Sequence, residues 1–293
     1  MYDVIIIGGG PAGVSTGLYV KRAGFNVCII AKGVGELDKA SRIENYYGFE
    51  NGITGKELQE NGIKQAKNLG IKVVEKEVVG IQYGTTNEVN FEVKVANQGR
   101  DEKYEATIVV LATGSNRNKP NIYGIKEFEG RGVSYCAVCD APFYRNKNVA
   151  VVGNGDYAIE EVENLLPIAN KVLMLTNGEN TAENRKKINI NKKKIKEVQG
   201  DSKVRAIEFE DGTVEEIDGI FIAQGIASST DFARKIGARI ENNNIVVNEN
   251  METTINNLYA CGDCTGGILQ VSKAVYDGTK AGLAIIKKLR KNK

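Results

Sequence analysis

Residues 2–30 read YDVIIIGGGPAGVSTGLYVKRAGFNVCII, and this stretch decides the fold. A short apolar run (2–7) is followed by a glycine cluster, an amphipathic stretch (12–23) and a second apolar run (27–30). Short apolar runs next to glycine predict buried strands, and apolar residues at helical spacing predict a helix between them. The order of strand, glycine turn, helix and strand is that of a βαβ unit with parallel strands.

The same order recurs in the middle of the chain. A strand-like run (148–152) precedes the loop GNGDYA (153–158), which is followed by a helical stretch to Ala169 and another run at 171–175. Each copy is followed by a pair of strand-like runs around turn residues, which predicts a β-hairpin. These pairs are 89–95 with 103–108, around 97–100, and 204–210 with 214–217, around 211–212. After each hairpin comes another buried run, IVVLATGS (108–115) and GIFIAQG (219–225).

A last segment has no counterpart in the second copy. It contains NNLYACGDCTGG (256–267) and a predicted helix over 270–289. We expect this segment to complete the first domain, which makes the second domain an insertion. The predicted fold is therefore α/β, with two Rossmann-like domains: residues 1–114 and 230–293 form the first, and residues 115–229 form the inserted second.

Composition excludes several classes of protein. The chain has 293 residues, 26% of them charged, with a net charge of +2. We therefore expect no binding to nucleic acid, which requires a strongly basic domain. No apolar run approaches the roughly 18 residues of a membrane span, and the first residues lack the pattern of a signal peptide, so we expect a cytoplasmic protein without membrane contact. The chain has no histidine, which removes the commonest general base and the commonest metal ligand.

The first glycine loop, GGGPAG, fits the dinucleotide motif at Gly8, Gly10 and Gly13. In that motif the first glycine permits a tight turn, the second lets the backbone approach a pyrophosphate, and the third allows close packing of helix on strand. The acidic residue expected after the second strand is missing, because that strand ends Ala31-Lys32-Gly33, and Glu36 is the nearest carboxylate.

The stretch SYCAVCDAPFY (134–144) places Cys136 and Cys139 two residues apart, with Asp140 adjacent. Such a pair closes a small disulfide ring, and thiol–disulfide exchange needs one attacking and one resolving thiol. Asp140 is a candidate for holding the proton that histidine holds elsewhere. The alternative is half of a zinc or iron–sulfur site, for which Cys261 and Cys264 would supply the other half.

Over nearly its whole length the sequence resembles the low-molecular-weight thioredoxin reductases, whose fold is the three-layer ββα type of the pyridine nucleotide-disulfide oxidoreductases. The matching stretches are GGGPAG, IENYYGF (43–49), LATGS (111–115), GRGVSYCAVCD (130–140), VVGNGDYAIEE (151–161) and CGDCTGG (261–267). The resemblance implies a homodimer with FAD in the first domain, a dithiol in the inserted nicotinamide-type domain, and transfer of electrons from flavin to disulfide to thioredoxin.

The resemblance also assigns roles to single residues. Cys136, Cys139 and Asp140 are catalytic, and we favour Cys136 as the thiol that attacks thioredoxin. The residues that line FAD are Gly8, Gly10, Pro11, Ala12, Gly13, Glu36, Leu37, Asn45, Ala112, Thr113, Gly114, Gly262, Asp263, Gln270 and Val271. No metal is expected. Cys261 and Cys264 are interpreted as small side chains packed beside FAD, with a second redox pair as the alternative.

The loop after the second copy's second strand decides the electron donor. Members of the family that use NADPH carry an arginine-rich cluster there, whereas this chain reads Leu175-Thr176-Asn177-Gly178-Glu179. NADPH is therefore an unlikely donor, and the sequence looks most like the ferredoxin-dependent flavin thioredoxin reductases, which take electrons from reduced ferredoxin. The alternatives are an NADPH-dependent thioredoxin reductase with an atypical nucleotide site, with 185–187 folding back to hold the phosphate, and a flavin redox sensor without turnover. The basic residues near the end of the chain (287–293) suit an acidic partner or a solvated helix end.

Overall fold

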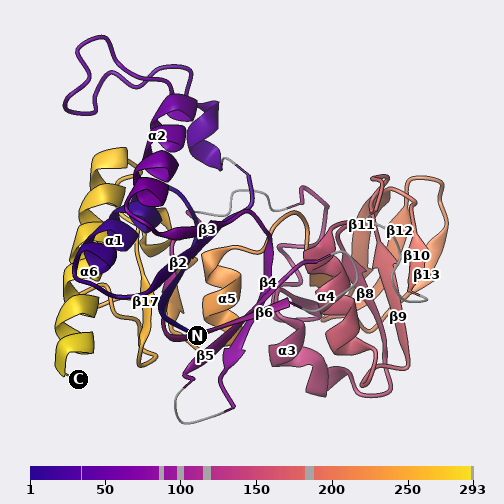
Figure 1. The fold of residues 1–293 in the computed structure, drawn as a ribbon. Coiled ribbons are helices and arrows are strands. Elements are labelled where there is room, and N and C mark those ends of the chain that lie inside the picture. The colour runs from indigo at the N-terminus through magenta and orange to yellow at the C-terminus, as the bar shows by residue number, and fades with distance from the viewer. Residues whose placement is uncertain (34, 86–88, 98–101, 115–119, 182–187, 292–293) are drawn as a thin grey trace. The chain divides into compact units, whose positions relative to one another are not determined.

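The structure is a computed structural model and describes residues 1–33, 35–85, 89–97, 102–114, 120–181 and 188–291. The chain divides into two compact units, which are described separately (Figure 1). Unit 1 comprises Met1–Asn116 and Ser228–Lys293, and unit 2 comprises Arg117–Ala227. The sequence analysis set the domain boundaries after residues 114 and 229, and the first of these adjoins residues 115–119, which are outside the described part of the chain.

Unit 1 is built on a sheet in the order β3-β2-β1-β6-β5-β4, with β17 also paired to β6. Strands β3, β2, β1, β6 and β17 run parallel, and β5 and β4 extend the sheet in antiparallel fashion. The central strands are apolar throughout because both faces of a parallel sheet are covered. The bounds are β1 Tyr2–Ile7, β2 Val27–Ile30, β3 Lys72–Val74, β4 Val78–Tyr83, β5 Phe91–Val95, β6 Glu102–Leu111 and β17 Leu258–Ala260.

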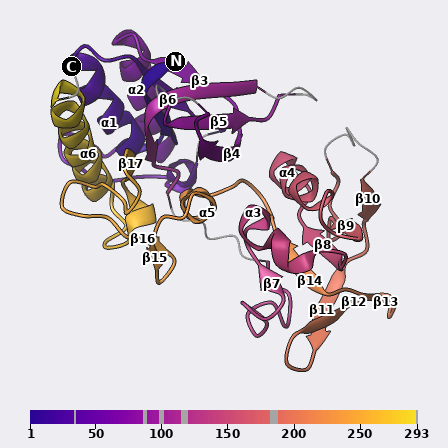
Figure 2. The ribbon, with the colours of Figure 1, turned by 90° about the horizontal axis from the view of Figure 1, so that it is seen from below.

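Two helices from opposite ends of the chain lie side by side in unit 1, α1 (Pro11–Arg22) and α6 (Val271–Lys291), as Figures 1 and 2 show. The Thr16 hydroxyl donates to the carbonyl of Gly278 at 3.0 Å, and a Cβ at Gly278 would lie 2.2 Å from the carbonyl oxygen of Ala12. Glycine in α6 therefore lets the last helix pack directly on the first. The remaining elements of unit 1 are η1 Glu36–Lys39, α2 Gly55–Asn68, α5 Ser229–Lys235, β15 Ile240–Glu241, β16 Asn244–Ile245 and η3 Asp263–Thr265.

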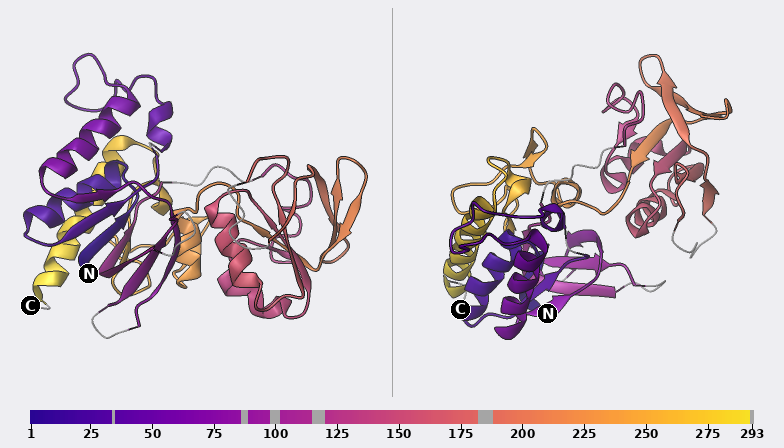
Figure 3. Two further views of the ribbon diagram at one scale, coloured as in Figure 1. Left: turned by 45° about the vertical axis from the view of Figure 1, so that its right-hand side comes forward. Right: turned by 90° about the horizontal axis from the view of Figure 1, so that it is seen from above.

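Unit 2 repeats the plan with a parallel sheet in the order β10-β9-β8-β14-β7. A three-stranded antiparallel ribbon, β11-β12-β13, projects from it (Figure 3). The strands are β7 Val133–Ser134, β8 Asn148–Val152, β9 Lys171–Leu175, β10 Asn189–Asn191, β11 Ile195–Gly200, β12 Val204–Phe209, β13 Val214–Glu216 and β14 Gly219–Ile222. The helices are α3 Ala137–Asp140, η2 Ala141–Tyr144 and α4 Asp156–Leu165. In the parts of the chain described, no helix is both long and apolar enough to cross a membrane.

The predicted α/β fold with parallel Rossmann-like sheets is confirmed, as are both hairpins. One prediction was wrong in detail, because residues 103–108 and the apolar residues that follow, up to Leu111, belong to one strand, β6, of 10 residues. Its polar first half pairs with β5, and its apolar second half pairs with β17. Helix α2 and strands β4 and β11 were not predicted.

Candidate active site and cofactor site

The first glycine loop joins β1 to α1, and its motif glycines differ in what surrounds them. Gly8 has φ +118°, and a Cβ there would lie 2.3 Å from the carbonyl oxygen of Ala112. A Cβ at Gly13 would lie 2.1 Å from the carbonyl oxygen of Gly8. A Cβ at Gly10 would meet no protein atom within 4 Å. Gly8 and Gly13 are therefore required by the fold, whereas Gly10 borders open space.

This open space fits the pyrophosphate of FAD. Helix α1 begins at Pro11 directly after Gly10, and no side chain caps its first N–H groups. Uncapped N–H groups and the positive end of the helix dipole favour a bound phosphate. Pro11 lacks an N–H at the one position where none is needed, and Ala12 is small enough to be buried in the first turn. The residues present at this loop thus suit the cofactor that the sequence predicts.

At the end of β6 the chain leaves unit 1, and it returns at Ser228. Ala112 is buried, and the next residue, Thr113, is bonded to Ser229 in both directions. The Thr113 N–H donates to the Ser229 hydroxyl at 2.9 Å, and the Ser229 N–H donates to the Thr113 hydroxyl at 2.7 Å. Gly114 follows with φ +78° and open space at its Cβ position. The predicted residues 112–114 therefore form a fixed corner beside the first glycine loop.

The Gly262-Asp263 turn is held by two charged residues that sequence reasoning missed, Lys273 and Asp277. The Gly262 N–H donates to Asp277 Oδ2 at 3.2 Å, and Lys273 Nζ donates to the carbonyl oxygens of Gly262 and Gly266 at 2.8 Å and 2.6 Å. Lys273 and Asp277 themselves pair at 2.8 Å. Asp277 is a carboxylate on the apolar face of the predicted helix over 270–289, and this was the sequence signal for the contacts of Lys273 and Asp277 with the turn.

Five further predicted residues come from separate segments of unit 1. Asn45 Nδ2 donates to Gln270 Oε1 at 3.0 Å, which joins two predicted FAD neighbours far apart in the sequence. Val271 opens α6, and Leu37 lies half-buried in η1. The side chain of Glu36 falls outside the described part of the structure.

A buried carboxylate, that of Glu77, lies beside the strand end where the expected acid is missing. Lys32 occupies that position, and its Nζ lies 2.5 Å from Oε2 of Glu77. The Glu77 side chain is 2% exposed and that of Lys32 is 50% exposed. The carboxylate therefore comes from the connection between β3 and β4, where no local sequence signal places it.

Helix α2 also contacts the first glycine loop. Gln59 Nε2 donates to the carbonyl oxygen of Gly9 at 2.5 Å, and Gln59 is buried. The helix starts with a capping box, in which Thr54 and Glu57 bond each other's backbone N–H groups. The pattern TGKE at residues 54–57 was the sequence signal for this helix.

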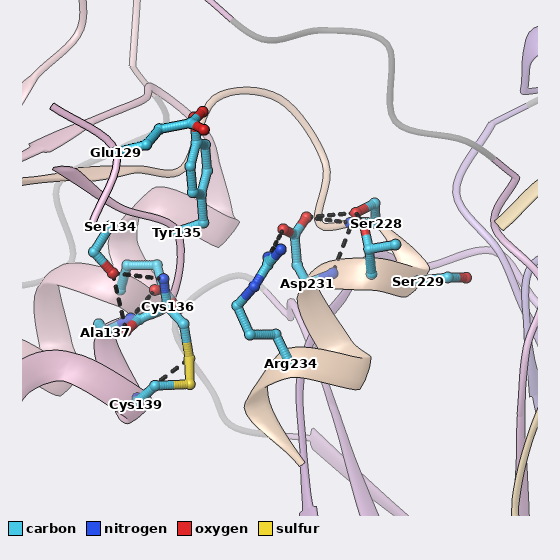
Figure 4. Close-up of polar contacts among 12 residues, drawn as sticks. Glu129, Ser134, Tyr135, Cys136, Ala137, Cys139, Ser228, Ser229, Asp231 and Arg234 are labelled. Atoms are coloured by element: carbon cyan, nitrogen blue, oxygen red, sulfur yellow. Dashed lines mark hydrogen bonds and ion pairs between the residues drawn. A yellow bond between two sulfur atoms is a disulfide. The ribbon is translucent and has the colours of Figure 1, made fainter. Parts of the chain in front are cut away.

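In unit 2, Cys136 and Cys139 form a disulfide, with their Cα atoms 5.3 Å apart (Figure 4). Cys136 is the N-cap of α3, and the Cys139 N–H donates to Cys136 Sγ at 3.2 Å. Cys136 is 1% exposed, whereas Cys139 is exposed to solvent. The short helix thus brings the predicted pair together and presents one of its two sulfur atoms.

Asp140 is tied to the disulfide through Ser134, for which the sequence analysis assigned no role. The Ser134 hydroxyl donates to Asp140 Oδ2 at 2.7 Å and accepts the Cys136 N–H at 3.1 Å. Ser134 is buried at the end of β7. One hydroxyl therefore fixes the carboxyl group of Asp140 relative to the backbone of Cys136.

The other three cysteines, Cys28, Cys261 and Cys264, are free and buried. Burial raises the pKa of the Cys28 thiol to about 11 and that of Cys264 to about 12, and it also raises the pKa of Cys261. The Cys264 thiol donates to the carbonyl oxygen of Leu111 at 3.6 Å. These thiols stay protonated at neutral pH, which suits packing residues rather than a second exchanging pair.

Thiol titration should distinguish the Cys136–Cys139 pair from the three buried thiols. We expect none of the 5 cysteines of the native oxidised protein to react rapidly with Ellman's reagent at pH 8, and two to react after mild reduction. The three buried thiols should react only in denaturant. Rapid reaction of a third thiol in the native protein would show that Cys261 or Cys264 is accessible and redox-active.

The metal-site alternative requires Cys136 and Cys139 as thiolates, whereas the structure joins them in a disulfide. Within the described ranges, no group of three or more His, Cys, Asp or Glu residues is arranged to hold a metal ion.

The second glycine loop keeps the backbone of a dinucleotide site. Gly153 has φ +159°, and a Cβ there would lie 2.2 Å from the carbonyl oxygen of Ala223. Gly155 is the N-cap of α4, and its Cβ position is open except for the carbonyl oxygen of Gly225 at 3.7 Å. The local fold of a nucleotide-binding unit is therefore intact.

The loop after β9, the position expected to recognise the ribose of a nicotinamide cofactor, is held by side chains from inside and outside the loop. Asn154 Nδ2, from the second glycine loop, donates to the carbonyl oxygen of Asn180 at 3.1 Å. Asn177 adopts φ +53° and accepts the Ile195 N–H at 2.7 Å. The stem of Lys194 lies against Gly178, 3.0 Å from its Cβ position. Residues 185–187, considered above for a compensating role, are outside the described ranges.

Comparison with known proteins places these features in a family. Residues 2–278 match the family model for pyridine nucleotide-disulphide oxidoreductase. A thioredoxin reductase from Listeria innocua is 34% identical, over 96% of this chain and 92% of that protein. The crystal structure of the atypical thioredoxin reductase TRi from Desulfovibrio vulgaris Hildenborough is similar, with TM-score 0.92 and 33% identity over 99% of both chains. A ferredoxin-flavin thioredoxin reductase from Clostridium acetobutylicum has TM-score 0.73 and 34% identity, over 99% of this chain and 98% of that one.

Proposed function

Since the chain belongs to the thioredoxin reductases of the pyridine nucleotide-disulphide oxidoreductase family, we propose that its electrons come from reduced ferredoxin rather than from NADPH. The family assignment makes it a flavin- and disulfide-dependent thioredoxin reductase. When bound, FAD would supply an electron pair for reduction of the Cys136–Cys139 disulfide. The residues that would hold FAD are those of the first glycine loop, the corner at 112–114, and the Gly262-Asp263 turn.

The loop after β9 carries the proposal. Residues 176–181 read TNGENT and include no cation to bind a 2′-phosphate. Asn154, in the second glycine loop, donates to the carbonyl oxygen of Asn180 in this segment. Charge-assisted hydrogen bonds are worth about 1.5–3 kcal/mol each. Losing two of them weakens NADPH binding by about two to four decades.

Two observations support ferredoxin as the donor. A protein of similar fold and 34% identity is named a ferredoxin-flavin thioredoxin reductase. The reaction is also downhill, because a ferredoxin at roughly −400 mV lies about 130 mV below a thioredoxin at about −270 mV. That difference is about 6 kcal/mol for two electrons.

The dithiol then reduces thioredoxin by exchange. The Cys136 thiolate attacks one sulfur of the thioredoxin disulfide, which forms a mixed disulfide and releases the other thioredoxin sulfur as a thiolate. Cys139 attacks Cys136 Sγ, which restores the disulfide and releases the second thioredoxin thiolate. Two electrons pass to thioredoxin, and the protons of Cys136 and Cys139 end on its two sulfurs. Asp140, fixed by Ser134, is placed to hold the proton in transit.

The burial of Cys136 bears on this assignment. Cys136 is 1% exposed in the oxidised protein. If it attacks thioredoxin, it must become exposed after reduction. Cys139, already exposed, is the competing nucleophile.

One observation favours an NADPH-dependent enzyme with an atypical site. Lys194 lies against Gly178 in the loop after β9, so a cation is near the place where a 2′-phosphate would bind. A flavin redox sensor without turnover is the candidate from another class, and steady reduction of thioredoxin would eliminate it. A homodimer, which the family resemblance implies, and a cytoplasmic location, which the sequence pattern predicts, complete the proposal.

An anaerobic titration tests the donor. The oxidised protein, loaded with FAD, is mixed first with NADPH and then with reduced ferredoxin while flavin absorbance is followed. We expect NADPH at micromolar concentrations to leave the flavin oxidised, and ferredoxin to bleach it and generate thiols on added thioredoxin. Rapid bleaching by NADPH alone would show that the loop after β9 grips the phosphate after all. Lys194→Ala would then identify the cation responsible.

A further inference from the structure

A buried glutamate from α4 reaches the disulfide helix. Glu161 is 1% exposed, and its Oε2 accepts the N–H of Ala137, the first residue of α3, at 2.7 Å. Buried carboxyl groups are rare unless their oxygens are hydrogen-bonded. Here Glu161 Oε2 is bonded to the backbone N–H of Ala137, which lies between the two cysteines.

We propose that Glu161 is a positioning residue for the dithiol, holding the first turn of α3 in place when the disulfide is open. The proposal rests on Cys136 and Cys139 as the exchanging pair, and it is independent of the electron donor.

The N–H groups at the start of α3 show why such an anchor is needed. A helix leaves its first N–H groups without partners inside the helix. Here side chains accept three N–H groups at this end: Ser134 accepts that of Cys136, Glu161 that of Ala137, and Cys136 Sγ that of Cys139.

Reduction removes one of these restraints. The disulfide closes the turn covalently, so in the oxidised protein Glu161 adds little to its order. In the dithiol the covalent closure is lost and Cys136 Sγ is freed, which leaves Ser134 and Glu161 as the side chains that hold the turn. Loss of the Glu161 bond should therefore destabilise the dithiol more than the disulfide.

The same contact gives the second glycine loop a structural role. Helix α4 begins at Asp156 directly after Gly155, and Glu161 lies on this helix. The loop and helix therefore keep a task without a nucleotide, because they set the position of Glu161 under the disulfide helix.

The test is the equilibrium of the Cys136–Cys139 pair in dithiothreitol redox buffers, read by counting thiols, without ferredoxin, NADPH or thioredoxin. Glu161→Leu removes the acceptor at similar size, and Glu161→Gln retains an acceptor. Ala137→Pro removes the donor at a helix position that accepts proline, next to a Cys136 with an extended backbone, and its ring carbon displaces the Glu161 carboxylate. Glu160→Leu is the matched control on the same helix.

We expect Glu161→Leu and Ala137→Pro each to shift the equilibrium about tenfold toward the disulfide, about 30 mV for two electrons. The double variant should shift no further than either single one, because both remove the same bond. Glu161→Gln and Glu160→Leu should match the wild type. No shift in Glu161→Leu, a shift toward the dithiol, or additive shifts in the double variant would each overturn the proposal. The expected shift in Glu161→Leu, together with a wild-type protein that does not turn over with ferredoxin, would count against the donor and not against Glu161.

Discussion

Serine in place of either Cys136 or Cys139 is expected to lower thioredoxin reduction by roughly a thousandfold or more, with FAD still bound. Exchange requires one thiol to attack and the other to resolve. None of the three free thiols replaces them, because Cys28, Cys261 and Cys264 are buried with raised pKa values. The measurement is the steady rate of thiol formation on thioredoxin, with flavin content determined in parallel.

The two serine variants also identify the attacking thiol. With Cys139→Ser, Cys136 should form a stable mixed disulfide with thioredoxin, and Cys136→Ser should form none. A mixed disulfide that forms only in Cys136→Ser, where Cys139 is the free thiol, would reverse the assignment. That result would agree with the exposure of Cys139 in the oxidised structure. Cys28→Ala is the control, since Cys28 is a buried residue of β2 far in sequence from the pair. Undiminished turnover in either serine variant would mean that the disulfide is not the route to thioredoxin.

Alanine at Gly10 is expected to lower FAD affinity by about two to four decades, yet leave the apoprotein nearly as stable as the wild type. A Cβ at Gly10 meets no protein atom within 4 Å, and its φ of −75° is open to alanine. The added methyl group would occupy the space assigned to the pyrophosphate and displace it from the N–H groups of α1. Losing two charge-assisted bonds costs about 3–6 kcal/mol. Flavin retention on dialysis and denaturant unfolding of the apoprotein measure the two effects.

Gly13→Ala is the matched variant in the same loop. Its Cβ would lie 2.1 Å from the carbonyl oxygen of Gly8, so the turn itself must shift. We expect the free energy of unfolding of the apoprotein to fall by about 1–3 kcal/mol. FAD binding at wild-type strength in Gly10→Ala would contradict the placement of the pyrophosphate at this loop.

Features that depend on neighbours in the sequence were predictable, and features that depend on distant partners were not. The glycine loops, the central strands and the Cys136–Cys139 pair follow from local spacing. Gln59 and Glu161 each bind backbone far away in the chain, at Gly9 and Ala137. No local pattern encodes such contacts, because the partner is set by how helices pack on the sheets. Strand β6 was divided in the prediction because its polar first half and apolar second half meet different neighbours.

The pairing of β17 with β6 has a consequence for biosynthesis. Unit 1 needs β17 and α6 from the end of the chain, whereas unit 2 is contiguous and complete once residue 227 has been made. Domains generally fold as units during translation, and the entropy lost in closing a loop grows with the length of flexible chain. We therefore expect unit 2 to fold first on the ribosome, and its compaction to shorten the loop that β6 and β17 must close. Until β17 has left the ribosome, the apolar edge of β6 remains uncovered, and we expect chaperones to bind it.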